Sequence, residues 1–286
     1  VMNAGAQVRM LDDRRLHLHH GPIDLIIEAF GRDWQRALKA AEVRFDSILN
    51  ELVAELPLLR TPLGDVRPKG AVAQRMAAAV KPFSDMFVTP MAAVAGSVAD
   101  EVLAAMCAAC ALEKAYVNNG GDIAFWLTKG RDLTAAIHSG CDAGRVRLGW
   151  DQTGRGLASS GWRGRSYSLG IADAVTVVAA NAAMADAAAT LIANAVDLPG
   201  HPAVLRAPAC DLSPDSDLGM RLVTTGVGDL RPADVAQALV AGKQVAEQMQ
   251  ARGFISAAAL FLAGEVVMLG GLDLTKGVED ARLQIA

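Results

Sequence analysis

The fold is decided by residues Gly156–Val196, which read GLASSGWRGRSYSLGIADAVTVVAANAAMADAAATLIANAV. A loop rich in Gly and Ser leads into the apolar, β-branched run Ala174–Ala180, which predicts a buried strand. Asn181 is a favourable N-cap residue and alanine is the strongest helix former, so we predict a helix from Ala182 to about Ala195. A loop, a buried strand and a capped helix therefore follow one another in this stretch.

Two polar side chains share one face of this predicted helix. Asp186 and Thr190 are four residues apart, so they lie one above the other. A carboxylate and a hydroxyl at that spacing offer two oxygens to a hard cation such as Mg²⁺, which keeps water ligands and bridges phosphate oxygens. The same spacing also fits the solvated side of an amphipathic helix whose packed side carries Met184, Ala188 and Leu191. The residues alone leave both interpretations open.

A glycine turn forms a second candidate site. Tyr116–Asn118 predicts a short strand, and it is followed by Asn119, Gly120, Gly121 and Asp122. Two glycines permit positive φ angles and leave backbone N–H groups free to point at an anion. An ordinary hairpin turn has the same composition. The turn by itself leaves both interpretations open.

The loop at 154–170 is the third candidate. It carries five glycines and four serines beside Arg163 and Arg165. Such a loop could wrap a diphosphate, with guanidinium groups on its oxygens. A solvent-exposed loop without a ligand fits the same composition equally well.

Three short segments resemble blocks of the ApbE family, the FAD:protein FMN transferases. Ala185–Thr190 (ADAAAT) resembles the family's ADALAT-type segment, and Tyr116–Ile123 (YVNNGGDI) is similar to its VNxGGDI block. Ala158–Gly161 (ASSG) is similar to its ATSG block. The three segments come in the order of the family and cover roughly Thr89–Val196, with weaker likeness on either side.

The resemblance implies a ligand and a set of residues that hold it. In that family the Asp and Thr of the ADALAT segment help to hold the Mg²⁺ that engages the FAD diphosphate, and an Ala of a GGIAKG segment adds a main-chain oxygen. By resemblance, the metal ligands here would be Asp186, Thr190 and Ala95, and the cofactor FAD or FMN. The residues expected to contact the cofactor are Asn118, Asn119, Gly120, Gly121, Asp122, Ser159, Ser160, Gly161, Arg163 and Arg165.

The chain departs from the family pattern at two positions. Gly96 stands where the GGIAKG segment has Lys, and Ser168–Asp173 contains no His where the family has a HIIDPxTG segment whose His is linked to catalysis. We therefore expect a flavin-nucleotide and Mg²⁺-binding protein of the uncharacterised ApbE-related branch. Whether it transfers FMN to a protein acceptor stays open, and no catalytic residue is assigned. The alternative is a non-catalytic accessory protein of sulfur or homocysteine metabolism that kept the fold.

Composition narrows the class of protein. Hydrophobic residues make up 52% and charged residues 20%, which indicates a globular chain. Lys and Arg number 27 against 31 Asp and Glu, so no basic excess points to nucleic acid or a membrane surface. The longest apolar run, Ile255–Ala263, is too short to span a bilayer. Without a signal peptide or an early Cys, we expect a cytoplasmic protein. Cys107 and Cys110 form a CxxC, for which small packed side chains are the favoured interpretation.

The pattern of elements predicts an α+β fold with helices packed on largely antiparallel sheet. The resemblance implies that this is the ApbE-like fold, with a ligand cleft between the Gly120 turn and the Asp186 helix. Further helices are expected at Asp33–Leu56 and Arg231–Arg252, and a hairpin at Ile255–Leu269. Another helix is expected to begin with Thr89 as its N-cap and Pro90 at its first position. A strand is expected at Leu218–Thr224. We expect residues 1–286 to form a single domain, with residues 1–14 disordered or vector-derived. Homo-oligomerisation is left open.

Overall fold

The computed structural model describes residues 5–138 and 143–276. Its largest sheet has nine strands, and neighbouring strands in it are antiparallel. In spatial order they are β1 (Gln7–Met10), β2 (Arg15–His20), β3 (Ile23–Phe30), β4 (Lys114–Asn119), β5 (Asp122–Leu127), β8 (Gly156–Ser160), β9 (Ala174–Ala179), β12 (Ile255–Leu262) and β13 (Glu265–Leu269).

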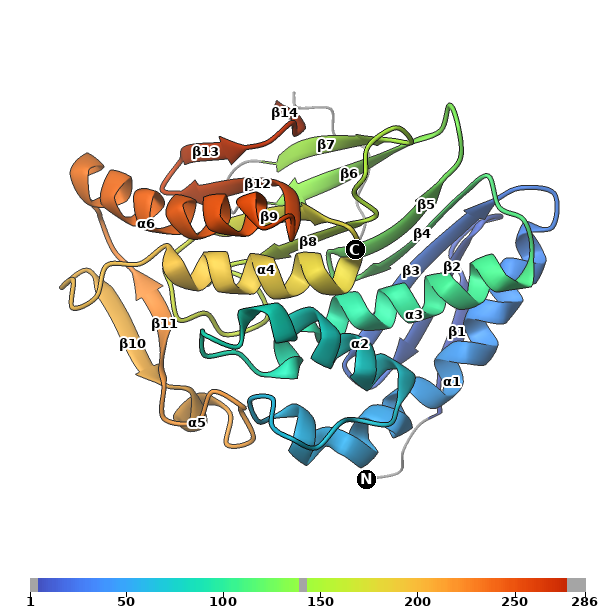
Figure 1. Cartoon of the computed structure of the whole chain (residues 1–286), viewed down its shortest axis with the longest axis horizontal. Helices are drawn as coiled ribbons and strands as arrows, with labels where there is room; N and C mark the ends of the chain where they lie inside the picture. The colour runs from blue at the N-terminus through green and yellow to red at the C-terminus, as the bar shows by residue number, and fades with distance from the viewer. Residues whose placement is uncertain (1–4, 139–142, 277–286) are drawn as a thin grey trace.

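Five long helices lie on one side of this sheet (Figure 1); four of them contact its strands, and the second in chain order packs on three of the others. They are α1 (Trp34–Leu59), α2 (Ala71–Val80), α3 (Val94–Ala109), α4 (Ala182–Ala195) and α6 (Pro232–Ala251). Three shorter helices are η1 (Lys81–Phe83), η2 (Pro90–Ala93) and α5 (Ala209–Leu212). Helices combined with antiparallel sheet confirm the predicted α+β class.

Two small sheets complete the architecture. The first contains β6 (Asp132–His138), β7 (Ala143–Gly149) and β14 (Asp273–Lys276), in the order β14-β7-β6. The second pairs β10 (Val204–Pro208) with β11 (Leu222–Val227). The β6–β7 hairpin is an excursion, because the chain leaves the large sheet after β5 and returns to pair β8 with that same strand.

The centre of the large sheet is covered on both faces. Val175 and Val177 of β9 pack in the cluster that includes α4 and α6, whereas Val178 packs with Leu133 and Val146 of the small sheet. All six residues of β9 are therefore buried. A strand covered on both sides reads as a continuous apolar run instead of an alternating one. This is the physical reason for the AVTVVA sequence.

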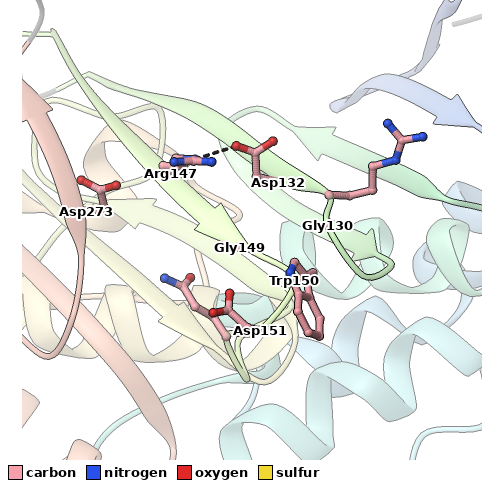
Figure 2. Close-up of a pocket in the computed structure, with 9 residues that line it drawn as sticks. Gly130, Asp132, Arg147, Gly149, Trp150, Asp151 and Asp273 are labelled. Carbon is pink, nitrogen blue, oxygen red and sulfur yellow. Dashed lines mark hydrogen bonds and ion pairs between the residues drawn. The ribbon is translucent and has the colours of Figure 1, made fainter.

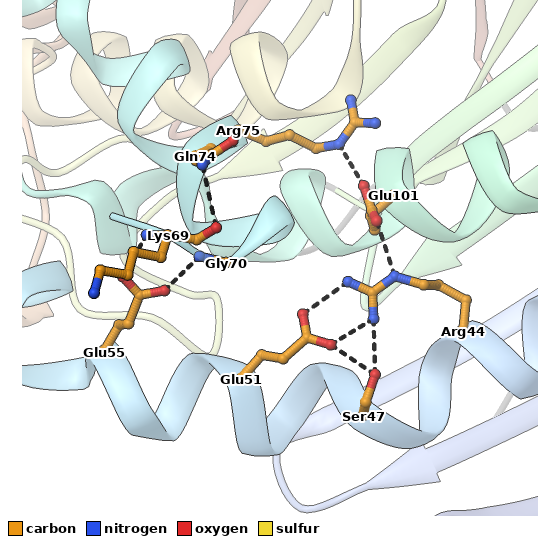
Figure 3. Close-up of polar contacts among 9 residues, drawn as sticks. All are labelled: Arg44, Ser47, Glu51, Glu55, Lys69, Gly70, Gln74, Arg75 and Glu101. Atoms are coloured by element: carbon orange, nitrogen blue, oxygen red, sulfur yellow. Dashed lines mark hydrogen bonds and ion pairs between the residues drawn. The ribbon is translucent and has the colours of Figure 1, made fainter. Parts of the chain in front are cut away.

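An ion-pair network fixes the helices that lie over the N-terminal half of the sheet (Figure 3). The guanidinium of Arg44 on α1 holds both oxygens of Glu51, at 2.8 and 2.9 Å, and its Nε donates to Glu101 on α3 at 2.8 Å. Arg75 on α2 binds the other oxygen of Glu101, also at 2.8 Å. The network ties α3 to α1 and α2.

Several expectations about local structure need correction. Gln7–Met10, within the segment expected to be disordered, pairs with β2 and so extends the sheet. Thr89 does not cap a helix, since its hydroxyl donates to Asp217 at 2.5 Å and a 3₁₀ turn precedes α3. Part of the expected 154–170 loop is strand β8, and the strand expected at Leu218–Thr224 begins at Leu222.

One segment, Pro90–Ala109, is long and apolar enough to cross a membrane by length and composition alone. In the fold it comprises η2 and α3 and packs against α1, α4, β4 and β5. Val98, Val102 and Met106 are fully buried there. These contacts are those of a core helix, which satisfies the same length and hydropathy test.

Candidate functional site

The N-terminus of α4 is capped twice. The Asn181 side chain accepts the backbone N–H of Met184 at 2.8 Å, as predicted from the sequence. The carboxylate of Asp100 on α3 accepts the N–H groups of Ala182 and Ala183, at 3.0 and 2.8 Å. A carboxylate from another helix therefore satisfies backbone donors that the first turn of α4 leaves unpaired.

Helix α4 in turn caps the N-terminus of α3. Asp186 accepts the backbone N–H of Gly96, in the first turn of α3, at 3.0 Å. The two helices thus exchange caps, each through an aspartate near its own start. They approach so closely that a Cβ on Gly96 would overlap the carbonyl of Ala182. We call this arrangement the reciprocal cap, defined by Asp100, Asp186 and the backbone groups they accept.

The predicted glycine turn lies beside the reciprocal cap. Gly120 and Gly121 join β4 to β5 with φ angles of +65° and +112°, and the Gly121 N–H donates to Asn118 Oδ1 at 2.8 Å. The Asn119 amide donates to the Ala95 carbonyl of α3 at 3.1 Å. This bond holds the turn against the helix start whose N–H group binds Asp186.

Asp122 and Asp186 form a pair of neighbouring carboxyls. Burial raises the pKa of Asp122 to about 7, against the opposing effects of the Ser159 N–H, which it accepts at 3.2 Å, and of the charge on Arg165. Burial also raises the pKa of Asp186 well above its usual value, and the negative charge of Asp122 adds to that increase. Two carboxyls that oppose each other's ionisation favour a bound cation or a shared proton.

The two arginines of the predicted loop have different positions. The Arg165 guanidinium lies against the turn, where a Cβ on Gly120 would overlap it, and the side chain is exposed. Arg163 instead binds Asp173 at 2.5 Å and stacks on the Trp162 ring at 4.6 Å. Arg165 is therefore placed to contact an anion at the turn, whereas Arg163 fastens the loop to its own sheet.

Some of the remaining predicted residues lie beside Asp122 or Asp186, and others have only a packing or strand-pairing role. Ser159 lies beside Asp122 through its backbone N–H, while its hydroxyl pairs with Thr176 Oγ1 at 2.8 Å. Thr190 is half-buried one turn beyond Asp186. Gly161 has a packing role, since a Cβ there would overlap the Asp173 carbonyl, and Ser160 is paired within the sheet. Asp100 was not predicted, because nothing in the sequence signals a cap that joins residues 82 positions apart.

The cysteines do not extend this site. Cys107, Cys110 and Cys210 are free thiols, each half-buried rather than fully buried. Burial and the neighbouring Cys110 raise the pKa of the Cys107 thiol, which reduces its thiolate fraction at neutral pH. Cys141 lies outside the described residues.

Comparisons with known proteins place the chain in a family. A UPF0280 protein of Methanopyrus kandleri is 36% identical over 177 residues, which cover 60% of this chain and 69% of the relative. A UPF0280 protein of Methanosphaerula palustris is 34% identical over 189 residues, which cover 64% of this chain and 77% of the relative. The sequence profile of the family described as AbpE bacteria matches residues 8–268, and the chain therefore belongs to that family.

Proposed function

We propose that this chain binds the diphosphate of a flavin nucleotide, together with Mg²⁺, at the Asp122–Asp186 pair. The observation that carries the proposal is that three segments of the chain meet at this place. Hydrogen bonds hold the β4–β5 turn, the first turn of α3 and Asp186 of α4 together, although these segments are far apart in the sequence. Both carboxyls have a raised pKa, so the site favours a divalent cation that would stabilise their ionised forms.

The donor set fits Mg²⁺. This ion is usually held by one or two carboxylates, with phosphate oxygens and water in the other positions. In the described part of the chain no three His, Cys, Asp or Glu side chains are grouped to hold a metal. At the proposed site the protein would supply two carboxylates, those of Asp122 and Asp186. Thr190 lies one turn beyond Asp186 on the same face of α4. Bound Mg²⁺ would neutralise charge on the diphosphate.

Ala95 is the weakest member of the proposed metal set. Its carbonyl oxygen already accepts the Asn119 amide, so a metal would use the remaining lone pair of that oxygen. Arg165 would contribute a guanidinium to the diphosphate from the side of the turn. Flavin as the nucleotide base is supported only by the resemblance to the ApbE family.

Transfer of FMN to a protein acceptor is a separate proposal and has less support. The resemblance includes the Asp and Thr of the metal segment but not the family's His, and Gly96 occupies the position of its Lys. The overlap of any Cβ at Gly96 with the Ala182 carbonyl explains why a Lys does not fit in this chain. We assign binding to the site and no catalytic base.

Titration of FAD by isothermal calorimetry, with and without Mg²⁺, tests the proposal. We expect binding that requires Mg²⁺ and that is weakened at least tenfold by Asp186→Asn, which removes the charge but leaves an oxygen for the Gly96 N–H. Asp46→Asn, an exposed aspartate of α1, is the matched control and should bind as the parent does. Absence of Mg²⁺-dependent binding would refute the proposal.

A second measurement separates binding from transfer. The protein is incubated with FAD, Mg²⁺ and a flavoprotein acceptor, and AMP release and covalent FMN are followed. AMP release that is lost in Asp186→Asn would support transferase activity. Mg²⁺-dependent binding without AMP release would support the alternative of a non-catalytic protein that kept the binding site.

A further inference from the structure

A cavity lies on the face of the large sheet opposite the helices, between the β6–β7 excursion and strand β14. It has a volume of about 300 Å³ and is lined by Gly130, Arg131, Asp132, Arg147, Gly149, Trp150, Asp151, Gln152 and Asp273. We call it the excursion cavity. Figure 2 shows the carboxylates of Asp132, Asp151 and Asp273 spaced around it, with the Trp150 indole at one side. None of these residues belongs to the site proposed above.

The lining carries uncompensated negative charge. Arg147 binds Asp132 at 2.6 Å, and Arg131 pairs with Glu113, which lies outside the lining. Among the residues the structure describes, Asp151 and Asp273 make no ion pair within 4 Å. Of the two arginines in the lining, only Arg147 remains to balance the three carboxylates, because Arg131 is paired with Glu113. A ligand with positive charge is favoured.

The carboxylates do not converge on a single point. No three of the acidic, His or Cys side chains in residues 5–138 and 143–276 are grouped to hold a metal ion, and this includes Asp132, Asp151 and Asp273. A point charge such as Ca²⁺ or Mg²⁺ would therefore contact too few of them. An extended cation with several N–H donors can reach carboxylates that lie apart.

The aromatic side of the cavity selects among such cations. Trp150 is 40% exposed, so part of its ring is available to a ligand. A guanidinium is planar and weakly hydrated, and it stacks on an indole while its edge donates to carboxylates. An ammonium group is strongly hydrated and gains less from such a surface.

The loop that carries Trp150 and Asp151 is held in place before any ligand binds. The guanidinium of Arg155 donates to three carbonyls of this loop, those of Trp150 at 2.9 Å, Gly154 at 2.6 Å and Gln152. The backbone N–H of Trp150 also donates to the Arg131 carbonyl at 3.1 Å. A preorganised loop loses little conformational entropy when a ligand binds.

We propose that the excursion cavity binds a guanidinium group, stacked on Trp150 and hydrogen-bonded to Asp151 and Asp273. The group would come either from a small guanidinium compound or from an arginine side chain of a peptide, since the cavity is large enough for one such side chain. The proposal is independent of nucleotide binding at Asp122 and Asp186.

Calorimetric titration with butylguanidinium and with butylammonium tests the proposal, because the two ions share their chain and charge and differ only in the head group. We expect one saturable site for butylguanidinium and binding at least fivefold weaker for butylammonium. An acetylated and amidated Gly-Arg-Gly tripeptide distinguishes the two sources. Tighter binding of the tripeptide indicates a peptide, and tighter binding of butylguanidinium indicates a small compound.

Substitutions locate the binding. Asp151→Asn and Asp273→Asn should each raise the dissociation constant of butylguanidinium by about fivefold, the size expected for exposed ion pairs, and Trp150→Ala should raise it similarly. The control Asp46→Asn should not change it. These side chains are exposed, so circular dichroism should show an intact fold. Absence of saturable binding, equal binding of both ions, or insensitivity to both Asn substitutions would overturn the proposal.

Discussion

Gly96 lies at the closest approach of two helices. A methyl group there would overlap the Ala182 carbonyl, which is backbone and cannot rotate away. We therefore predict that Gly96→Ala lowers the free energy of unfolding by about 1–3 kcal/mol through overpacking. Gly64→Ala is the control, because a Cβ at Gly64 meets no atom within 4 Å. Urea denaturation of both variants measures the difference, and equal stabilities would contradict the prediction.

Asp122 makes stability depend on pH. Its pKa is about 7 in the folded chain, against a usual value of 3.8, so the folded state binds a proton that the unfolded state has released between these values. Stability should therefore fall as pH rises from about 4 to about 7 and change little above that range. Asp122→Asn keeps an oxygen for the Ser159 N–H and should reduce this slope.

The measurement is urea denaturation across that pH range in buffer containing a chelator. The neighbouring Asp186 has a raised pKa as well, so part of the slope should remain in Asp122→Asn. Asp46→Asn should retain the full slope. If the free energy of unfolding of the parent chain instead rises from pH 4 to pH 7, the assigned pKa directions are wrong.

Single residues of the site were predictable only in part. The N-cap role of Asn181 follows from its position before a strongly helical stretch, because capping is local. The choice of Asp186 rested on the resemblance to the ApbE family, because its spacing from Thr190 also fits a solvated helix face. Asp100 acts across a gap of 82 residues, and its partner is a backbone N–H that has no sequence signature. Arg163 and Arg165 look alike in the sequence, yet only the fold of the loop decides which of them meets Gly120 and which meets Asp173.

The reciprocal cap joins two helices as a unit. Asp100→Ala would leave the N–H groups of Ala182 and Ala183 without their acceptor in a largely buried place, so we predict a loss of about 1–3 kcal/mol of stability. Asp100→Asn keeps one acceptor oxygen and should lose less. Urea denaturation midpoints test this order, and a greater loss in the Asn variant would contradict it.

The Arg44–Glu101–Arg75 network should contribute to stability more than an isolated surface pair. The Glu101 side chain is only 14% exposed and serves two arginines, so Glu101→Gln should cost about 1–2 kcal/mol. Glu42→Gln removes the partner of Lys39, whose side chain is 66% exposed, and should cost at most about 0.5 kcal/mol. Thermal denaturation of both variants compares them. Similar losses would show that the network adds nothing beyond its separate pairs.

At the level of elements, the sequence predicts those with strong periodicity. Helix α4 has the predicted bounds, and the hairpin β12–β13 and helix α6 lie where they were expected. Strand β8 was hidden in a stretch rich in Gly and Ser. Its Gly156 is required because a Cβ there would overlap the peptide that joins Asn181 to Ala182. A glycine chosen for close packing reads in the sequence as a loop residue.

The whole molecule should unfold as one unit. Ala182 packs in the core under α1 and α3, while its neighbours on α4 pack in the core under α6, so one helix belongs to both. We predict that far-ultraviolet circular dichroism and tryptophan fluorescence report the same urea midpoint. Two separated transitions would show that the halves of the sheet are independent, and the expectation of a single domain would then be wrong.

The β6–β7 excursion leaves the large sheet after β5 and returns to the same strand, so β5 and β8 remain neighbours whatever lies between them. Insertions and deletions in such a connection leave the rest of the large sheet in place. The length and sequence of this connection can therefore change without breaking the pairing of β5 with β8, whereas the excursion cavity also depends on Asp273 of β14, which pairs with β7.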